Sequence, residues 1–294
     1  MRKSLVTIAV LGTLALPTAV FAADAAPAAA PAPAYTISYN VGLFSQYVFR
    51  GLTQTDKKPA LQGGVDFSHA SGLYLGSWAS NISWLEDGKS TTGLNTYYDN
   101  SSLELDVYGG YRNTIGETGL GYDVGVLQYI YPGKKTSLAT ATANTTELYG
   151  ALSYKWLQAK FSSVVSDDAF NNANGTGTYY AELNANIPLA DSGITANLHV
   201  GRQKFDGHAL DILYTYTDWK IGATKSFANG VNVGAYYTDT NAKDRAGYAG
   251  YVSGNLFFGI VLNKKKLILF SLSQPNFCAR KRTSFLCRGQ NLLS

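Results

Sequence analysis

The chain has 294 residues, of which 15% are charged and 13% aromatic, and it holds 30 Gly, 21 Tyr and only two Cys. Its net charge of +4 combines unlike parts, because all 20 acidic residues lie at or before Asp244 whereas seven basic residues follow Gly254. The charge therefore does not indicate a nucleic-acid-binding surface, and the lack of any run of about 17 apolar residues argues against a membrane-spanning helix.

The N-terminus is typical of a bacterial secretory signal peptide. Arg2 and Lys3 precede the apolar stretch 4–16, and Val20-Phe21-Ala22 supplies small residues at the expected cleavage site. We place the signal peptide at residues 1–22; a membrane anchor is the alternative, but the apolar run is short and is followed by Pro17. Residues 23–34 form an Ala/Pro-rich linker. Export to the bacterial outer membrane is the localisation that the next segments favour.

From Tyr35 onward, apolar and polar residues alternate with a period of two, which predicts strands. The clearest example is 103–112, where Leu103, Leu105 and Val107 alternate with Glu104 and Asp106. The expected strands lie in 35–49, 61–68, 73–84, 103–112, 120–131, 147–156, 161–166, 179–187, 194–201, 212–217, 218–226, 231–239 and within 248–263.

These strands favour an all-β fold, an antiparallel transmembrane β-barrel of about 12 strands (12–14) over residues 35–263. One parity is apolar along the whole strand and the other is polar and charged, which suits lipid outside and a wet lumen inside. Short turns alternate with long polar loops, as expected for periplasmic turns and outer loops. Tyr and Trp near strand ends suit aromatic girdles at the membrane interfaces. A large secreted β-sandwich is the alternative, but its core would have to hold the charged parity.

The polar parity supplies ten candidate pore-lining residues. They are Arg50, Asp66, Glu104, Asp106, Arg112, Asp123, Glu147, Lys155, Lys160 and Glu182. Charged rings of this kind set ion preference in a water-filled pore. Six acids against four bases predict no selectivity, and salt bridges that close the lumen are the alternative interpretation.

Several pieces of the chain resemble the TorF-type family of porins, catalogued as conserved hypothetical proteins of proteobacteria. The resemblance is carried by 47–54 with Phe49-Arg50-Gly51, by 60–66 with Gln62-Gly63-Gly64, and by 72–81; the pieces 103–111, 122–125 and 131–133 are weaker. It covers roughly 35–251 and implies an outer-membrane barrel without catalytic residues. It also implies a last strand that ends in an aromatic residue, read by the barrel-assembly machinery, whereas this chain ends in Leu293-Ser294.

The residues favour a channel for small hydrophilic solutes, surrounded by outer-membrane lipid and lipopolysaccharide, rather than an enzyme. His69, His199 and His208 lack metal-ligand spacing, and we expect no metal or cofactor. Ser68 and His69 face opposite ways on a strand, so they do not form a nucleophile–base pair by themselves. The alternative function is a closed outer-membrane barrel with a surface, adhesion or lipid-modifying role.

Residues 264–294 differ from the rest, with a basic composition and both cysteines, Cys278 and Cys287. Two interpretations compete: a basic segment at the membrane surface, or out-of-frame translation that begins near Lys264-Lys265-Lys266. We favour the second, because charge, cysteine use and periodicity all change at one point.

Overall fold

The computed structural model describes residues 34–87, 97–137, 139–244, 248 and 256–268. The expected signal peptide, nearly all of the expected linker and most of the 264–294 segment with both cysteines lie outside these residues.

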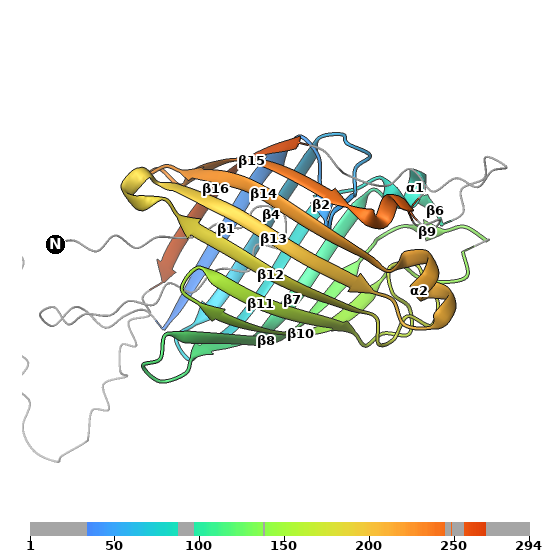
Figure 1. Ribbon diagram of the computed structural model, residues 1–294, viewed down its shortest axis with the longest axis horizontal. Coiled ribbons are helices and arrows are strands. Elements are labelled where there is room, and N and C mark those ends of the chain that lie inside the picture. The colour runs from blue at the N-terminus through green and yellow to red at the C-terminus, as the bar shows by residue number, and fades with distance from the viewer. Residues whose placement is uncertain (1–33, 88–96, 138, 245–247, 249–255, 269–294) are drawn as a thin grey trace, which may run out of the picture.

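Twelve antiparallel strands form one closed barrel (Figure 1). In chain order they are β1 (Tyr35–Phe44), β4 (Ala60–His69), β5 (Leu73–Asn81), β7 (Leu103–Thr114), β8 (Leu120–Ile130), β10 (Thr145–Tyr154), β11 (Leu157–Val164), β12 (Tyr179–Pro188), β13 (Ile194–Lys204), β14 (Tyr216–Ser226), β15 (Val231–Thr240) and β16 (Leu256–Ile268). Each pairs with its neighbours in this order, and β16 pairs with β1 from Tyr35↔Ile268 to Phe44↔Gly259. The predicted fold class is confirmed.

Connections of two lengths alternate around the barrel. Turns 70–72, 115–119, 155–156, 189–193 and 227–230 are short, whereas connections 45–59, 82–102, 131–144, 165–178, 205–215 and 241–255 are long. The long connections carry the small elements β2 (Val48–Phe49), β3 (Leu52–Thr53), α1 (Trp84–Asp87), β6 (Tyr98–Asn100), β9 (Lys134–Lys135) and α2 (His208–Tyr214). All short turns therefore lie at one end of the barrel and all long connections at the other (Figure 1).

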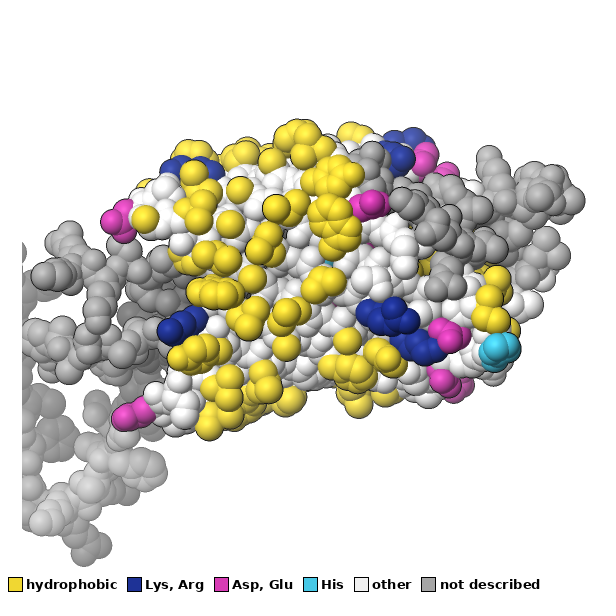
Figure 2. Space-filling model, in the orientation of Figure 1, with side chains coloured by type: hydrophobic (Ala, Val, Ile, Leu, Met, Phe, Trp, Pro, Cys, Tyr) yellow, Lys and Arg dark blue, Asp and Glu magenta, His cyan; other side chains and the backbone are white. Residues whose placement is uncertain are grey.

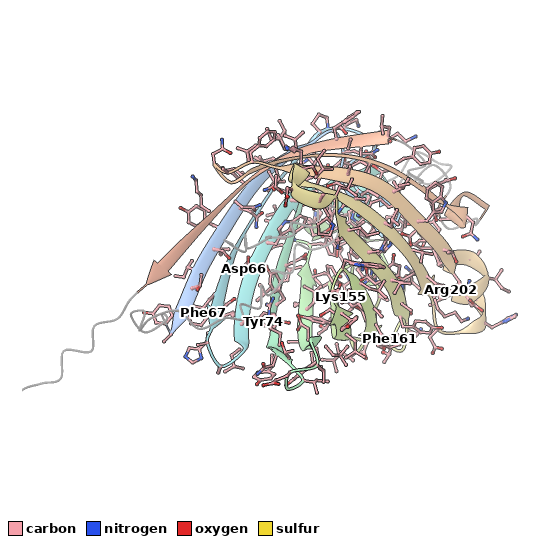
Figure 3. All side chains as sticks on the ribbon, turned by 60° about the vertical axis from the view of Figure 1, so that its left-hand side comes forward. Asp66, Phe67, Tyr74, Lys155, Phe161 and Arg202 are labelled. Carbon is pink, nitrogen blue, oxygen red and sulfur yellow. The ribbon has the colours of Figure 1, made fainter. Side chains whose placement is uncertain are left out.

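The strand alternation seen in the sequence separates an apolar exterior from a polar lumen. Asp66 and Phe67 are adjacent on β4, yet Asp66 is 5% exposed and Phe67 is 39% exposed, because they point to opposite faces (Figure 3). Outward residues such as Leu61 (62%) and Leu75 (58%) are among the most exposed side chains. Hydrophobic side chains are spread over the barrel wall, and charged ones gather towards its two ends (Figure 2).

Inside the barrel, large rings lie over glycines on the neighbouring strand. Tyr108 stands opposite Gly76 and Tyr74 opposite Gly110, and a Cβ on Gly76 would lie 2.4 Å from the Tyr108 ring. The same pairing joins Tyr149 to Gly125, Tyr236 to Gly222 and Phe44 to Gly259. Most buried tyrosines thus fill the lumen, so the expected aromatic girdles account for only part of the tyrosine content.

Three expected elements differ from the structure. The first strand does not continue through Tyr47 and Phe49, because β1 ends at Phe44 and the chain turns into the lumen. The first half of the expected strand 212–217 is the end of α2, and only 216–217 belong to a strand, β14. In α2, Leu210 and Tyr214, four residues apart, pack against a buried cluster that includes Phe205. The expected barrel end at 263 falls inside β16, whose backbone pairs with β1 as far as Ile268. Within the described ranges, no helix has the length and hydropathy needed to cross a membrane.

Candidate functional site

Eight of the ten predicted residues lie on the lumen side of the barrel wall. They are Asp66, Glu104, Asp106, Arg112, Asp123, Glu147, Lys160 and Glu182, from strands β4, β7, β8, β10, β11 and β12. Their side chains point into the lumen, where they contact other inward side chains. The alternating pattern of the sequence was sufficient to find them.

The other two predicted residues differ from the expected wall positions. Lys155 lies in the two-residue turn between β10 and β11 with φ 54°, where it is exposed, so its prediction as a pore-lining residue is wrong. The prediction extended the alternation of β10 to Lys155, but β10 ends one residue earlier, at Tyr154. Arg50 does lie in the lumen, but it comes from the turn between β2 and β3 and not from a barrel strand.

The segment 45–59, which we call the inner loop, crosses the lumen from the β1–β4 side to the opposite wall. Arg50 at its tip donates two hydrogen bonds of 2.8 Å to the Glu147 carboxylate on β10 and one of 2.9 Å to Gln203 Oε1 on β13. The Arg50 and Glu147 side chains are only 5% and 1% exposed. The Arg50 guanidinium also lies 4.4 Å from the Tyr180 ring centroid and 4.8 Å from that of Phe49.

The backbone of the inner loop explains the Arg50-Gly51 pair. Arg50 has φ 46° and Gly51 φ 78°, so the hairpin between β2 and β3 turns through two left-handed residues. A Cβ on Gly51 would lie 2.4 Å from Asp218 Cβ on β14, so the tip is pressed against the far wall. Glycine suits this position because it adopts the left-handed backbone conformation and because it has no Cβ to clash with Asp218.

Two neighbouring carboxylates on β7 lie on the side of the lumen where the inner loop enters. Glu104 accepts a hydrogen bond of 2.7 Å from the Tyr47 hydroxyl, and the Tyr47 ring packs edge-on against Trp78 at 5.4 Å. Asp106, two residues further along the strand, has no measurable exposure, and neither of its oxygens has a hydrogen-bond partner in the described structure. No three His, Cys, Asp or Glu side chains of the described residues lie close enough together to hold a metal ion.

A second polar network lies on β12, β13 and β14. Tyr180 donates a hydrogen bond of 2.9 Å to Asp218 Oδ2, and His199 Nε2 lies 3.1 Å from Asp218 Oδ1. The other ring nitrogen of His199 lies 2.7 Å from Asn184 Oδ1, and Asn184 in turn donates to Glu182 at 2.8 Å. These lumen-facing side chains therefore form hydrogen bonds with one another along the inner wall and do not project singly into a wide pore.

Towards the short-turn end, tyrosines bind the remaining carboxylates. Tyr108 donates to Asp66 Oδ1 at 2.6 Å, and Tyr74 donates to Asp123 Oδ1 at 2.5 Å. The Arg112 guanidinium stacks over the Tyr74 ring at 3.6 Å.

The sequence-based list omitted several lumen residues that the structure brings into the site. Asp218, Lys220 and His199 are buried on the lumen side, and Gln203 and Tyr180 contact Arg50. The alternation of Asp218 and Lys220 with Trp219 and Ile221 was the signal that would have found two of them. With these additions, the described lumen contains seven acidic residues and four Lys or Arg.

His69 and the long-loop end of β13 make local contacts. His69 Nδ1 lies 2.8 Å from Ser71 Oγ within an exposed turn and accepts the Ser71 N–H at 3.1 Å, which is a turn contact. At the long-loop end, Lys204 Nζ lies 2.5 Å from Asp211 Oδ2, and this hydrogen bond lowers the pKa of the Asp211 carboxyl.

A family model described as "Bacterial protein of unknown function (Gcw_chp)" matches residues 28–264, most of the chain and all but the last few residues of the barrel. The chain belongs to the Gcw_chp family. A comparison with curated proteins found no match.

Among solved structures, the chain is similar to a KdgM porin at 8% identity, with 78% of this chain and 97% of that chain covered and a TM-score of 0.45. It is also similar to the P. putida toluene transporter TodX (10% identity, 82% and 91% covered, TM-score 0.45) and to an outer membrane channel from Pseudomonas putida F1 (13% identity, 81% and 97% covered, TM-score 0.43).

Proposed function

We propose that this Gcw_chp protein is an outer-membrane channel for the passive diffusion of small hydrophilic solutes. One observation carries the proposal: a closed barrel with apolar side chains over most of its described outer wall encloses a lumen lined by charged groups. An exposed apolar surface of this extent is unfavourable in water but suits lipid, and closure leaves no unpaired strand edge in the membrane.

The dimensions of the barrel support the same proposal. A ten-residue strand spans about 33 Å, and a tilt of ~40° reduces this to a height of ~25 Å, which matches the apolar band of outer-membrane barrels. In this orientation the short turns face the periplasm and the long connections, with α1 and α2, face outward. Insertion would engage the barrel-assembly machinery, and outer-membrane lipid and lipopolysaccharide would surround the wall. The TorF-type resemblance supports the same assignment.

The inner loop defines the state of the proposed channel. Arg50 and its partners fill the section of the lumen between β1 and the far side of the barrel at β10 and β13, so we interpret the structure as the closed or narrow form of the pore. This filled lumen also favours the second candidate function, a permanently closed barrel with a surface, adhesion or lipid-modifying role.

Planar-bilayer recording of the refolded full barrel tests the proposal. A channel predicts discrete conductance steps, and liposome swelling with sugars of increasing size would measure the exclusion limit. If neither the wild-type barrel nor a variant freed of the Arg50 contact conducts, the channel is refuted and the closed barrel is favoured.

A further inference from the structure

A groove of about 720 Å³ lies on the outer wall over β8 to β14. Lys160 and Glu182 also border it, but their positions on β11 and β12 alternate with the outward residues of the groove, and they belong to the lumen site. Its floor consists of small outward residues, Gly150, Ala159 and Ala181, and the larger Leu152 and Phe161 stand beside them. A Cβ on Gly150 would meet no atom within 4 Å, so the space above it is open. A floor of this apolar composition suits an apolar chain.

Strand register places a single cation beside this floor. Gly150 is opposite Phe161, Phe161 is opposite Ala181, and Ala181 is opposite Arg202, so the four residues form one row across β10 to β13. Arg202 and Phe161 are both labelled in Figure 3. Because Ala181 is small, the side chain of Arg202 borders the open floor. Arg202 Nη1 donates a hydrogen bond of 3.3 Å to Thr217 Oγ1, which also lines the groove.

The charges around the groove select an anion. The outward positions of β8 and β10 to β14, all within the described structure, carry no acidic residue. The cations at these positions are Arg202 and Lys204 near the long-loop end and Lys225 near the short-turn end. Lys204 is paired with Asp211 at 2.5 Å; Arg202 donates to the Thr217 hydroxyl and also lies close enough to Asp211 to help lower the pKa of its carboxyl. A planar guanidinium beside a hydroxyl is well suited to bind a phosphate through several hydrogen bonds.

We propose that the groove binds lipid A, the phosphorylated anchor of lipopolysaccharide, with one acyl chain over Gly150, Ala159 and Ala181 and one phosphate on Arg202. The inference rests on the proposed function, because it takes the long-loop end to face the outer leaflet, where this lipid lies. Arg202 is near that end of β13, and the apolar floor extends from it towards the middle of the wall, so head and chain have the order that lipid A requires.

Native mass spectrometry of the refolded full-length protein, after incubation with purified lipid A and detergent exchange, tests the inference. We expect one retained lipid A per barrel, and at least about a tenfold loss of retention in Arg202→Gln, because a charge-assisted contact is removed. Gly150→Leu should cause a similar loss, because its side chain would occupy the floor at a position where an added Cβ meets no protein atom within 4 Å. The matched controls Ala223→Leu and Lys225→Gln, both outward on β14 and outside the groove lining, should retain lipid A like the wild type.

Several outcomes would overturn the inference. Equal retention by wild type and Gly150→Leu would show that the groove is not the site, and equal retention of dephosphorylated lipid A would refute the role of Arg202. Equally strong retention of phosphatidylglycerol would refute lipid A as the occupant. Circular dichroism and heat-dependent gel mobility confirm that each variant is folded. Conductance recorded from the same samples separates the two proposals: conductance without retention refutes only the lipid site, and retention without conductance refutes only the channel.

Discussion

Replacing Arg50 with alanine should release the inner loop from the far wall of the barrel and raise the conductance of the pore. Arg50 provides the ion pair by which the loop tip reaches β10, with two hydrogen bonds of 2.8 Å to Glu147. The Arg50→Ala variant removes these, the bond to Gln203 and the contact with the Tyr180 ring. Glu147 is then left buried, and it still accepts a hydrogen bond of 3.3 Å from the Tyr129 hydroxyl.

The expected size of the effect follows from the burial of this pair. Removing one partner of a buried ion pair destabilises the structure by ~3–5 kcal/mol. The equilibrium between the docked and the released inner loop should therefore shift by roughly two to nearly four orders of magnitude. The contacts of Tyr47 with Glu104 and Trp78 remain and hold the base of the loop, so we expect frequent open events of the pore and not the loss of the barrel.

Single-channel recording in planar bilayers measures this prediction. Arg50→Ala should raise the open probability or the unitary conductance over the wild type. The double variant Arg50→Met with Glu147→Leu should return towards the wild type, because apolar residues of similar volume often replace a buried ion pair without loss. Lys58→Ala is the matched control, since Lys58 is an exposed cation of the same loop. Identical conductance of wild type and Arg50→Ala would refute the view that the inner loop obstructs the lumen.

Three further predictions follow from other parts of the barrel. Asp106→Asn should leave the ion preference of the open pore unchanged, seen as the same reversal potential in a salt gradient, because Asp106 has no measurable exposure and so does not meet ions in the pore. Gly76→Ala should destabilise the barrel in urea unfolding by ~1–3 kcal/mol, because its Cβ meets a facing tyrosine ring, whereas Gly150→Ala should be neutral or stabilising by up to about 1 kcal/mol. Lys204→Ala should raise the pKa of the Asp211 carboxyl towards the ordinary Asp value, as measured by NMR titration, because the hydrogen bond from Lys204 is lost. In the wild type, the stabilisation that comes with the lowered pKa is present at neutral pH and is lost as the pH falls through the pKa of Asp211.

The barrel wall was predictable from the sequence because, within each strand, polar lumen-facing residues alternate with apolar outward-facing residues. On β7, Glu104 and Asp106 alternate with Leu105 and Val107, and both faces are as expected. Eight lumen positions follow from this period of two, and the turn and loop residues between the periodic stretches gave about 12 strands.

Features that depend on contacts distant in sequence were not predictable. Tyr47 and Phe49 continue the apolar parity of β1, so no local signal shows that the chain leaves the wall at Ser45. The partner of Arg50 is 97 residues away, and only the closed barrel brings Glu147 opposite to it. The segment with α2 likewise depends on its tertiary neighbour Phe205, against which Tyr214 packs at 5.5 Å.

The pairs of lumen rings and facing glycines limit which substitutions this family can accept during evolution. Each ring occupies the volume that a side chain on the adjacent strand would need, so Tyr149 and Gly125, or Tyr236 and Gly222, act as one unit. A member that replaces such a glycine is expected to carry a smaller residue in place of the ring, and the reverse. Aligned Gcw_chp sequences should therefore show paired substitutions at these positions, and those pairs would report the strand register of each member without a structure.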